Sequence, residues 1–248
     1  MRIDLNCDMG EGCGNDADLM RYISSANVAC GFHAGDRATM ETTVDLALEN
    51  EVAIGAHPGY PDRENFGRTE MHLSPKKVNE IVSEQIATLS EIAKNKGASL
   101  THVKAHGALY NQAARDRELS AAIAEAVHAH DANLVLFCLS GSVMIVEAHR
   151  RGLKTANEVF ADRTYQADGS LTPRTRPDAL ISDPDTAVSQ ALSMIGKHSV
   201  TATDGTMVNL AADTICIHGD GPHALEFAMA LHDRLRSNGV RIASLRAQ

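Results

Sequence analysis

The chain has 248 residues, of which 44% are apolar and only 4% aromatic, and its net charge at pH 7 is −9. This length fits one barrel-sized α/β domain or two small domains, and the lack of a basic stripe argues against a nucleic-acid partner. A small anionic substrate is compatible with the composition, because a local arginine or lysine can act against the overall charge.

The cysteines and the N-terminal residues predict the compartment. The five cysteines are scattered and include no CxxC pair, which favours free thiols in a reducing compartment. The chain begins with Met-Arg-Ile-Asp-Leu-Asn, which lacks the features of a signal peptide, and its longest apolar stretch, 134–139, is too short to cross a bilayer. We therefore expect a cytoplasmic protein that does not associate with membranes.

Seven short apolar runs are typical of buried strands. They lie at residues 2–7, 26–31, 52–57, 100–106, 133–139, 157–161 and 213–218. Helical patterns separate most of them, and this alternation predicts parallel β-structure with right-handed crossovers. No linker or internal repeat interrupts the pattern, so we expect one α/β domain over residues 1–248.

The clearest helix is predicted over 75–96, where Ser74 is the N-cap and Pro75 lies in the first turn. Other helices are predicted at 36–50, 116–130 and 141–151, from the Asp183 cap to Gly196, and from about Pro222 onward. The two longest connections, 58–73 and 162–182, are typical of functional loops, because long structureless segments are uncommon in compact domains.

Four histidines each close one of the short apolar runs, beside a glycine or another small residue. They are His33, His57, His106 and His218. One histidine at a strand end is more often a hydrogen-bonded core residue than a catalyst. Four at equivalent places favour a shared site, because the carboxyl ends of parallel strands meet at one edge of a sheet or barrel. An enzyme is therefore the first hypothesis.

Strand alternation predicts an unusually polar interior. The side chains that share its face are Asp4, Asn6 and Asp8 in the first strand and His102, Lys104 and His106 in the fourth. Such a lining usually marks a site, because buried polar groups are costly unless paired. Lys104 has two interpretations: a base or Schiff-base amine with a lowered pKa, or an ion pair with Asp4 or Asp8. His102 is expected to lie deeper and to orient its neighbours.

The first strand is followed by a glycine-rich turn, Asp8-Met9-Gly10-Glu11-Gly12. Its glycines allow a ligand to approach the backbone closely, but the spacing GxGxG is not the dinucleotide fingerprint, and no P-loop occurs in the chain. Asp8 and Glu11 are either a general acid/base pair or ordinary turn and cap residues.

A divalent metal is an open possibility, because histidine and carboxylate side chains suit zinc-type or iron-type ions. The candidate ligands are Asp8, His33, His57, His106 and His218. No HExxH motif supports the metal.

The long segment 162–176 carries Arg163, Tyr165 and Arg174 beside a strand end. Guanidinium groups bind carboxylate or phosphate through two parallel hydrogen bonds, so this loop is a candidate anion site. The alternative is a solvated loop.

Seven motifs, in order along nearly the whole chain, carry a resemblance to a known family. They read Asp-Leu-Asn-Cys-Asp-Met-Gly-Glu-Gly (4–12), Ala-Asn-Val-Ala-Cys-Gly-Phe-His-Ala-Gly-Asp (26–36), Gly-Ala-His-Pro-Gly-Tyr-Pro-Asp (55–62), Phe-Gly-Arg (66–68), His-Gly-Ala-Leu-Tyr-Asn (106–111), Phe-Ala-Asp-Arg-Thr-Tyr (160–165) and His-Gly-Asp-Gly-Pro (218–222). The chain resembles the LamB/YcsF family, the A subunit of prokaryotic 5-oxoprolinase. Ala105 departs from the family, which usually has proline there, and we expect little effect because its side chain faces away from the interior.

The resemblance implies a seven-stranded parallel (β/α) barrel of the glycoside hydrolase and deacetylase type. It also implies a reaction that opens the lactam of 5-oxoproline to L-glutamate, coupled to hydrolysis of ATP to ADP and phosphate, in a complex with subunits B and C. Which subunit handles ATP is left open. Phosphorylation of the lactam oxygen would create a good leaving group, after which water could add with general-base help.

Strand-end positions supply the residue roles. Asp8, His57 and His106 are assigned to proton transfer, and Lys104 to stabilisation of developing negative charge. The residues assigned to substrate binding are Asn6, Glu11, His33, Arg163, Tyr165, Arg174, His218 and Asp220, with Arg163 or Arg174 on the carboxylate. Two alternatives remain: a metal-dependent amidohydrolase or deacetylase acting alone, and a non-catalytic subunit that binds substrate.

Overall fold

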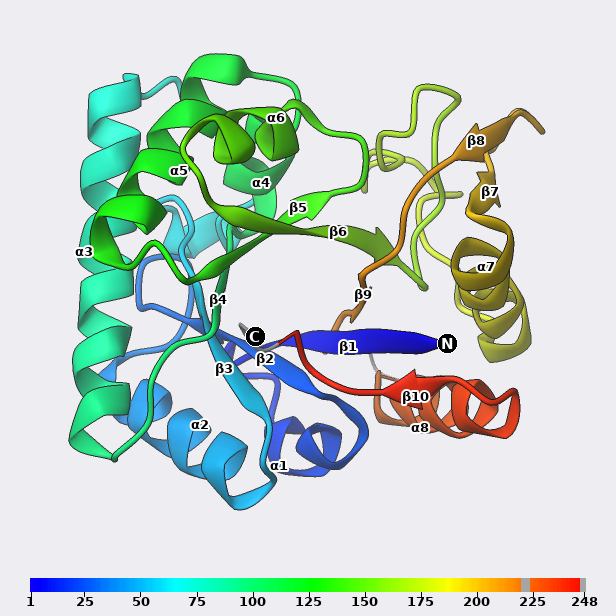
Figure 1. Ribbon diagram of the computed structural model, residues 1–248, viewed down its shortest axis with the longest axis horizontal. Helices are drawn as coiled ribbons and strands as arrows, with labels where there is room; N and C mark the ends of the chain where they lie inside the picture. The colour runs from blue at the N-terminus through cyan, green and yellow to red at the C-terminus, as the bar shows by residue number, and fades with distance from the viewer. Residues whose placement is uncertain (220–223, 246–248) are drawn as a thin grey trace.

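A computed structural model describes residues 1–219 and 224–245, and its centre is a closed barrel of parallel strands (Figure 1). The barrel strands are β1 (Arg2–Met9), β2 (Ser25–Ala29), β3 (Ala53–His57), β4 (His102–Lys104), β5 (Val135–Leu139), β6 (Lys154–Phe160) and β9 (Thr214–Ile217). Each pairs with the next, and β9 pairs with both β6 and β1, which closes the ring. The predicted seven-stranded parallel barrel is confirmed, with every strand near its predicted place.

Helices surround the strands on the outside (Figure 1). They are α1 (Asp16–Leu19), α2 (Arg37–Glu49), α3 (Pro75–Asn95), α4 (Gly107–Ala113), α5 (Arg117–His130), α6 (Val143–Arg150), α7 (Pro184–Lys197) and α8 (Ala224–Ser237), with short 3₁₀ turns η1 (Met20–Tyr22) and η2 (Arg63–Asn65). The predicted caps are confirmed: the side chains of Ser74 and Asp183 accept hydrogen bonds from the backbone N–H groups of Lys77 and Thr186. Pro222, the predicted start of the last helix, lies outside the described residues.

Three short strands were not predicted. β7 (Ser199–Thr201) and β8 (Met207–Asn209) form an antiparallel hairpin. β10 (Arg241–Ile242) pairs in parallel with the first two residues of β1. Each has only two or three residues, too few for a strand period to stand out in the sequence.

The barrel has an apolar outside and a polar inside. Ile3, Leu5 and Cys7 of β1 are buried in the core between strands and helices. Asp4 and Asn6 are also fully buried, but their side chains form hydrogen bonds with side chains of neighbouring strands. A separate small cluster of Val135, Phe137 and Ala156, packed against Leu245, supplies an apolar part of the interior. The polar residues are therefore concentrated on one part of the barrel wall.

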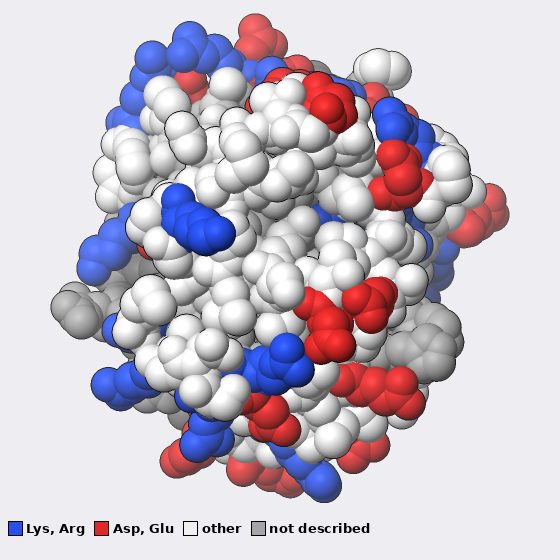
Figure 2. All heavy atoms as spheres, turned by 90° about the vertical axis from the view of Figure 1, so that its right-hand side faces the viewer, with Lys and Arg blue, Asp and Glu red and all other residues white. Residues whose placement is uncertain are grey.

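The outer surface carries mixed charge. Basic and acidic side chains are interspersed with uncharged ones on the face shown in Figure 2. Within residues 1–219 and 224–245, every helix is too short or too polar to cross a membrane.

Candidate active site

The carboxyl ends of the barrel strands open into a cavity of about 1020 Å³. Its lining includes the predicted residues Asp8, Glu11, His57, Lys104, His106, His218, Arg163 and Arg174. Residues from β1, β3 and β4, and from the segments that follow β6 and β9, therefore meet at one place, as the strand-end argument predicts.

A buried lysine is held by carboxylates beneath this cavity. Lys104 Nζ lies 2.9 Å from Asp8 Oδ1, 3.0 Å from Glu158 Oε1 and 3.0 Å from Cys216 Sγ. The hydroxyl of Tyr110 donates to the other oxygen of Glu158, over 2.6 Å. We call Asp8, Lys104, Glu158 and Cys216 the lysine cluster.

The surroundings of Lys104 fix its charge. Burial alone would lower the pKa of its ammonium, but the charges of Asp8 and Glu158 outweigh burial and raise the pKa well above its usual value. The interpretation of Lys104 as an amine with a lowered pKa is therefore wrong. The ion-pair interpretation is confirmed for Asp8, whereas Asp4 instead accepts hydrogen bonds from Ser24, Ser25 and Thr214.

Amide and imidazole groups support Asp8 from below. Asn27 Nδ2 donates to Asp8 Oδ1 over 2.8 Å and to Asn6 Oδ1 over 2.7 Å, and His102 Nε2 donates to Asn27 Oδ1 over 2.8 Å. Gly55 makes room for this ring, because a Cβ there would lie 2.1 Å from His102 Nε2. Asn6 was assigned to substrate binding, but it lies in this supporting layer and does not line the cavity.

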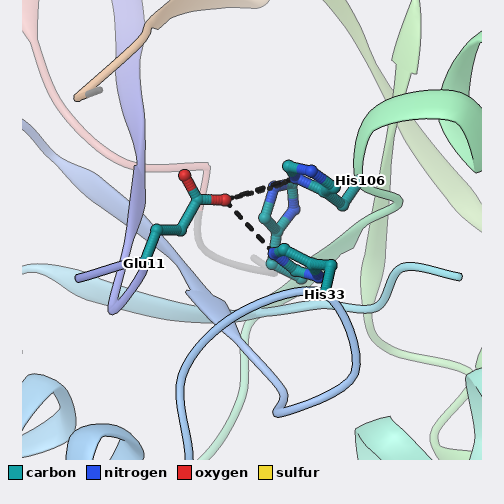
Figure 3. Close-up of side chains that lie close together, drawn as sticks. Glu11, His33 and His106 are labelled. Carbon is teal, nitrogen blue, oxygen red and sulfur yellow. Dashed lines mark hydrogen bonds and ion pairs between the residues drawn. The ribbon is translucent and has the colours of Figure 1, made fainter. Parts of the chain in front are cut away.

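Beside Asp8, one carboxylate faces three imidazoles, and we call Glu11, His33, His57 and His106 the histidine cluster. Glu11 Oε1 lies 3.2 Å from His33 Nε2, 3.3 Å from His106 Nδ1 and 3.8 Å from His57 Nε2. Figure 3 shows the Glu11 carboxylate pointing at the rings of His33 and His106. His57 Nε2 is also 3.4 Å from Asp8 Oδ2, which connects the two clusters.

Burial and charge act differently on the members of the histidine cluster. Burial lowers the pKa of His33 to about 3 and also lowers that of His106. Burial would also lower the pKa of His57, but the adjacent Asp8 carboxylate outweighs burial and raises this pKa above its usual value. Burial would raise the pKa of Glu11, yet hydrogen bonds from His106 and His33 keep it lowered.

A strained turn holds the histidine rings from the side. Phe66 has a left-handed backbone (φ 56°), uncommon for a bulky residue, and its carbonyl accepts a hydrogen bond from His106 Nε2 over 2.9 Å. Gly67 follows with φ 64°, and a Cβ there would lie 2.8 Å from His33 Cβ and 2.9 Å from His106 Cδ2. The Phe-Gly pair thus acts as a support for the rings.

His33 was assigned to substrate binding, but its ring lies behind His106. The two rings are stacked, with centroids 3.7 Å apart and planes at 3°, and His33 does not line the cavity. His218 lines the cavity but belongs to neither cluster by hydrogen bonding, since its Nδ1 lies 2.8 Å from Asp162 Oδ2. The five metal-ligand candidates from the sequence therefore do not surround one point. Asp220 lies outside the described residues.

Hydrogen bonds from its own polar residues hold the loop after β6 in place. Arg163 is nearly buried and donates to the carbonyls of Thr172 (2.5 Å) and Ala179 (3.3 Å), although it also lines the cavity. Tyr165 is buried away from the cavity, and its hydroxyl oxygen accepts from the Phe160 N–H. This contact gives Tyr165 a structural role, and its assignment to substrate binding stays a prediction. Arg174 remains a cavity residue.

Glu158 was missed by the sequence analysis. It is fully buried in β6 between the apolar residues Ala156 and Phe160, two positions away on either side. A charged residue between two apolar residues on one face of a strand was the available signal.

Comparisons with known proteins place the chain in a family. The LamB/YcsF family profile matches residues 3–248. A crystal structure of a lactam utilization protein from Thermus thermophilus is 45% identical, with 99% of this chain and 100% of that chain covered and a TM-score of 0.93.

More distant structures share the fold alone. A family 4 carbohydrate esterase from Streptomyces lividans is 12% identical over 100% of this chain and 94% of its own (TM-score 0.53). A putative cellobiose-phosphate cleavage protein from Enterococcus faecalis is 12% identical over 98% and 97% (TM-score 0.59). From the profile match and the 45% identity, the chain belongs to the LamB/YcsF family.

Proposed function

We propose that this chain is the ring-opening subunit of an ATP-dependent 5-oxoprolinase, which converts the lactam of 5-oxoproline to L-glutamate. The observation that carries the proposal is the ion-paired floor of Asp8, Lys104 and Glu158 beneath a cavity of about 1020 Å³. The 45% identity to a lactam utilization protein supports the choice of a lactam as substrate.

The cavity offers a positive wall for the carboxylate of 5-oxoproline. Arg163 and Arg174 both line it, and Arg163 already donates to two loop carbonyls. Both guanidinium groups are therefore candidates to bind the substrate carboxylate, and Arg163 also supports the loop around the cavity. His218, held by Asp162, borders the same cavity.

The floor supplies proton transfer at the reacting carbon. Burial would raise the pKa of Asp8, but His57 and Lys104 lower it well below its usual value, so Asp8 is a carboxylate at neutral pH. It can accept the proton of a water that attacks the ring carbon, while His57 and His106 are candidates to return a proton to the ring nitrogen. The Lys104 ammonium donates hydrogen bonds to Asp8, Asn6 and Cys216 and lies in ion-pair contact with Glu158. It therefore contributes a fixed positive charge that stabilises developing negative charge nearby.

Coupling to ATP solves a chemical problem of this substrate. A lactam is a poor electrophile, and transfer of the terminal phosphoryl group of ATP to its oxygen activates the ring carbon. Water adds to this carbon, and the C–N bond breaks as the nitrogen takes up a proton. A second water then hydrolyses the resulting acyl phosphate to glutamate and phosphate. The sequence has no P-loop, and we propose that partner subunits B and C handle ATP and deliver the activated lactam to this cavity.

Reconstitution with one component left out at a time tests this function. The chain is mixed with subunits B and C, 5-oxoproline and ATP, and glutamate and ADP are measured together. We expect equal amounts of both products in the complete mixture, and ADP without glutamate when this chain is omitted. Unchanged glutamate formation without this chain would reject the ring-opening role, and glutamate from this chain alone without ATP would favour a stand-alone amidohydrolase.

A further inference from the structure

Two histidine rings are oriented by backbone carbonyls, each of which contacts one ring nitrogen. His57 Nδ1 lies 2.8 Å from the Lys104 carbonyl, and His106 Nε2 lies 2.9 Å from the Phe66 carbonyl. A carbonyl only accepts, so each of these nitrogens carries the proton of the neutral ring. The remaining nitrogens, His57 Nε2 and His106 Nδ1, lie 2.9 Å apart. When both rings are neutral these two nitrogens have no proton, and their lone pairs are available to one ion. A histidine that binds a metal commonly shows this second contact to a carbonyl.

The carboxylate of Glu11 completes a set of three donor atoms. Its Oε1 lies 3.3 Å from His106 Nδ1 and 3.8 Å from His57 Nε2. With metal–ligand bonds of about 2.1 Å, donor atoms on one ion lie about 3.0 Å apart at a right angle and about 3.4 Å apart in a tetrahedron. The three measured separations bracket these values, and all three residues line the cavity, which leaves one side of the set open to a small molecule.

His33 does not belong to the ligand set, although it contacts the same oxygen of Glu11. Its ring is parallel to that of His106 at a centroid distance of 3.7 Å, so one ion cannot lie in both ring planes. Its Nε2 instead donates to Glu11 Oε1 over 3.2 Å, which makes it a positioning residue for the carboxylate.

A second group of donors, Asp8, Cys216 and His218, lies nearby but already has its cation. The ammonium of Lys104 is 2.9 Å from Asp8 Oδ1 and 3.0 Å from Cys216 Sγ. A metal ion placed among these atoms would be repelled by that fixed charge.

We propose that Glu11 Oε1, His57 Nε2 and His106 Nδ1 bind one divalent transition-metal ion of the zinc type. Two imidazoles and one carboxylate with an open side are a donor set that such ions accept. The inference concerns binding, does not depend on the lactam reaction, and has metal content as its readout. An ion here occupies the free nitrogens of both histidines. With the ion bound, Asp8 would return to the ring nitrogen the proton it takes from water, in place of His57 or His106.

The test is a titration of the chelator-treated full chain with Co²⁺ alone, followed by visible absorption and by metal content after dialysis. We expect one Co²⁺ per chain, with visible ligand-field bands. Glu11→Gln and His106→Asn should each weaken binding by about tenfold or more, since changes even to the supporting groups of a metal site have effects of this size. His218→Asn and Cys216→Ser are the matched controls from the other donor group and should stay within about twofold of the wild type.

Three outcomes would overturn the proposal: no saturable Co²⁺ binding by the wild type, binding lost in His218→Asn or Cys216→Ser, or binding unchanged in Glu11→Gln. Circular dichroism and the denaturation midpoint of each variant show that it is folded. If His106→Asn does not fold, Glu11→Gln decides alone, because Glu11 lies in the turn after β1 and outside the strand ladder. A failure here leaves the glutamate assay of the reconstituted complex unaffected.

Discussion

Two groups of buried carboxylates lie side by side at the carboxyl ends of the strands, and they are neutralised differently. In the lysine cluster, Asp8 and Glu158 contact the ammonium of Lys104 at 2.9 and 3.0 Å. In the histidine cluster, the ion-pair contacts of Glu11 within residues 1–219 and 224–245 are with imidazole nitrogens. An ammonium supplies a charge that hardly changes with pH, whereas a neutral imidazole has a lone pair that can accept a proton or a metal ion. The lysine cluster is therefore suited to a constant field, and the histidine cluster to exchange.

The largest expected effect comes from removing the fixed charge. Lys104→Met leaves Asp8 and Glu158 buried without a cation, which should lower the free energy of unfolding by about 3–5 kcal/mol. Chemical denaturation measures the loss, and glutamate formation by the reconstituted complex should disappear. Lys94→Met, on the exposed face of α3, is the matched control and should change stability by less than about 0.5 kcal/mol. Equal stability of Lys104→Met and Lys94→Met would contradict the role of the ion pair.

The Phe66–Gly67 turn, which supports the rings of the histidine cluster, can be altered without changing the side chains that are proposed to bind the metal. Gly67→Ala introduces a Cβ 2.8–2.9 Å from His33 and His106, whereas Gly97→Ala has a similar backbone (φ 76°) but no atom within 4 Å of the new Cβ. Both variants carry the strain of a left-handed alanine, so the difference between them measures the clash. We expect Gly67→Ala to lose at least about 1 kcal/mol more stability and to lower Co²⁺ affinity. Identical denaturation curves for the two variants would mean that the rings tolerate displacement.

The pair of Asp162 and His218 predicts a pH dependence outside both clusters. Burial would raise the pKa of Asp162, but His218 outweighs burial and lowers it below the unfolded value. This carboxylate therefore adds stability above its unfolded pKa of about 3.9, and the contribution is lost as the pH falls through the folded pKa. The stability advantage of the wild type over Asp162→Asn should shrink from pH 6 to pH 3, as measured by urea denaturation. A stability advantage that grows toward low pH would contradict the lowered pKa of Asp162 in the folded protein.

Thiol labelling separates Cys216 of the lysine cluster from an exposed cysteine. Burial raises the pKa of Cys216 well above its usual value despite the adjacent Lys104, and it also raises those of Cys7, Cys30 and Cys138. Cys13 is exposed. We expect iodoacetamide to label Cys13 alone in the native protein, as mass spectrometry of the digest would show, and Cys13→Ser to abolish labelling. Early labelling of Cys216 would mean that Lys104 stabilises a thiolate.

The sequence analysis predicted the barrel well because its signals are local. Each strand is a short apolar run that ends near a histidine or a polar residue, and the alternation of Asp4, Asn6 and Asp8 already separates the interior from the core. Helix caps such as Ser74 depend on neighbouring residues only, so they too could be predicted.

The rest depends on contacts across the closed barrel. Glu158 of β6 meets Lys104 of β4 only because both side chains enter the interior of the barrel, with β5 between their strands, a relation between distant segments that no local pattern contains. The stacking of His33 behind His106 likewise depends on the backbone at Phe66 and Gly67. The positions of the histidines at strand ends predicted that they lie in one region. These positions did not predict which histidines line the cavity and which lie behind them.

The central claim is that lactam opening takes place on the floor of this barrel, and one assay tests it most directly. Glutamate formed per ADP is measured in the complex with subunits B and C, using the wild type, Asp8→Asn and His130→Ala, the last an exposed residue at the end of α5. We predict that Asp8→Asn loses at least about a hundredfold in glutamate formation while His130→Ala keeps the wild-type rate. Full glutamate formation by a folded Asp8→Asn variant would contradict the account.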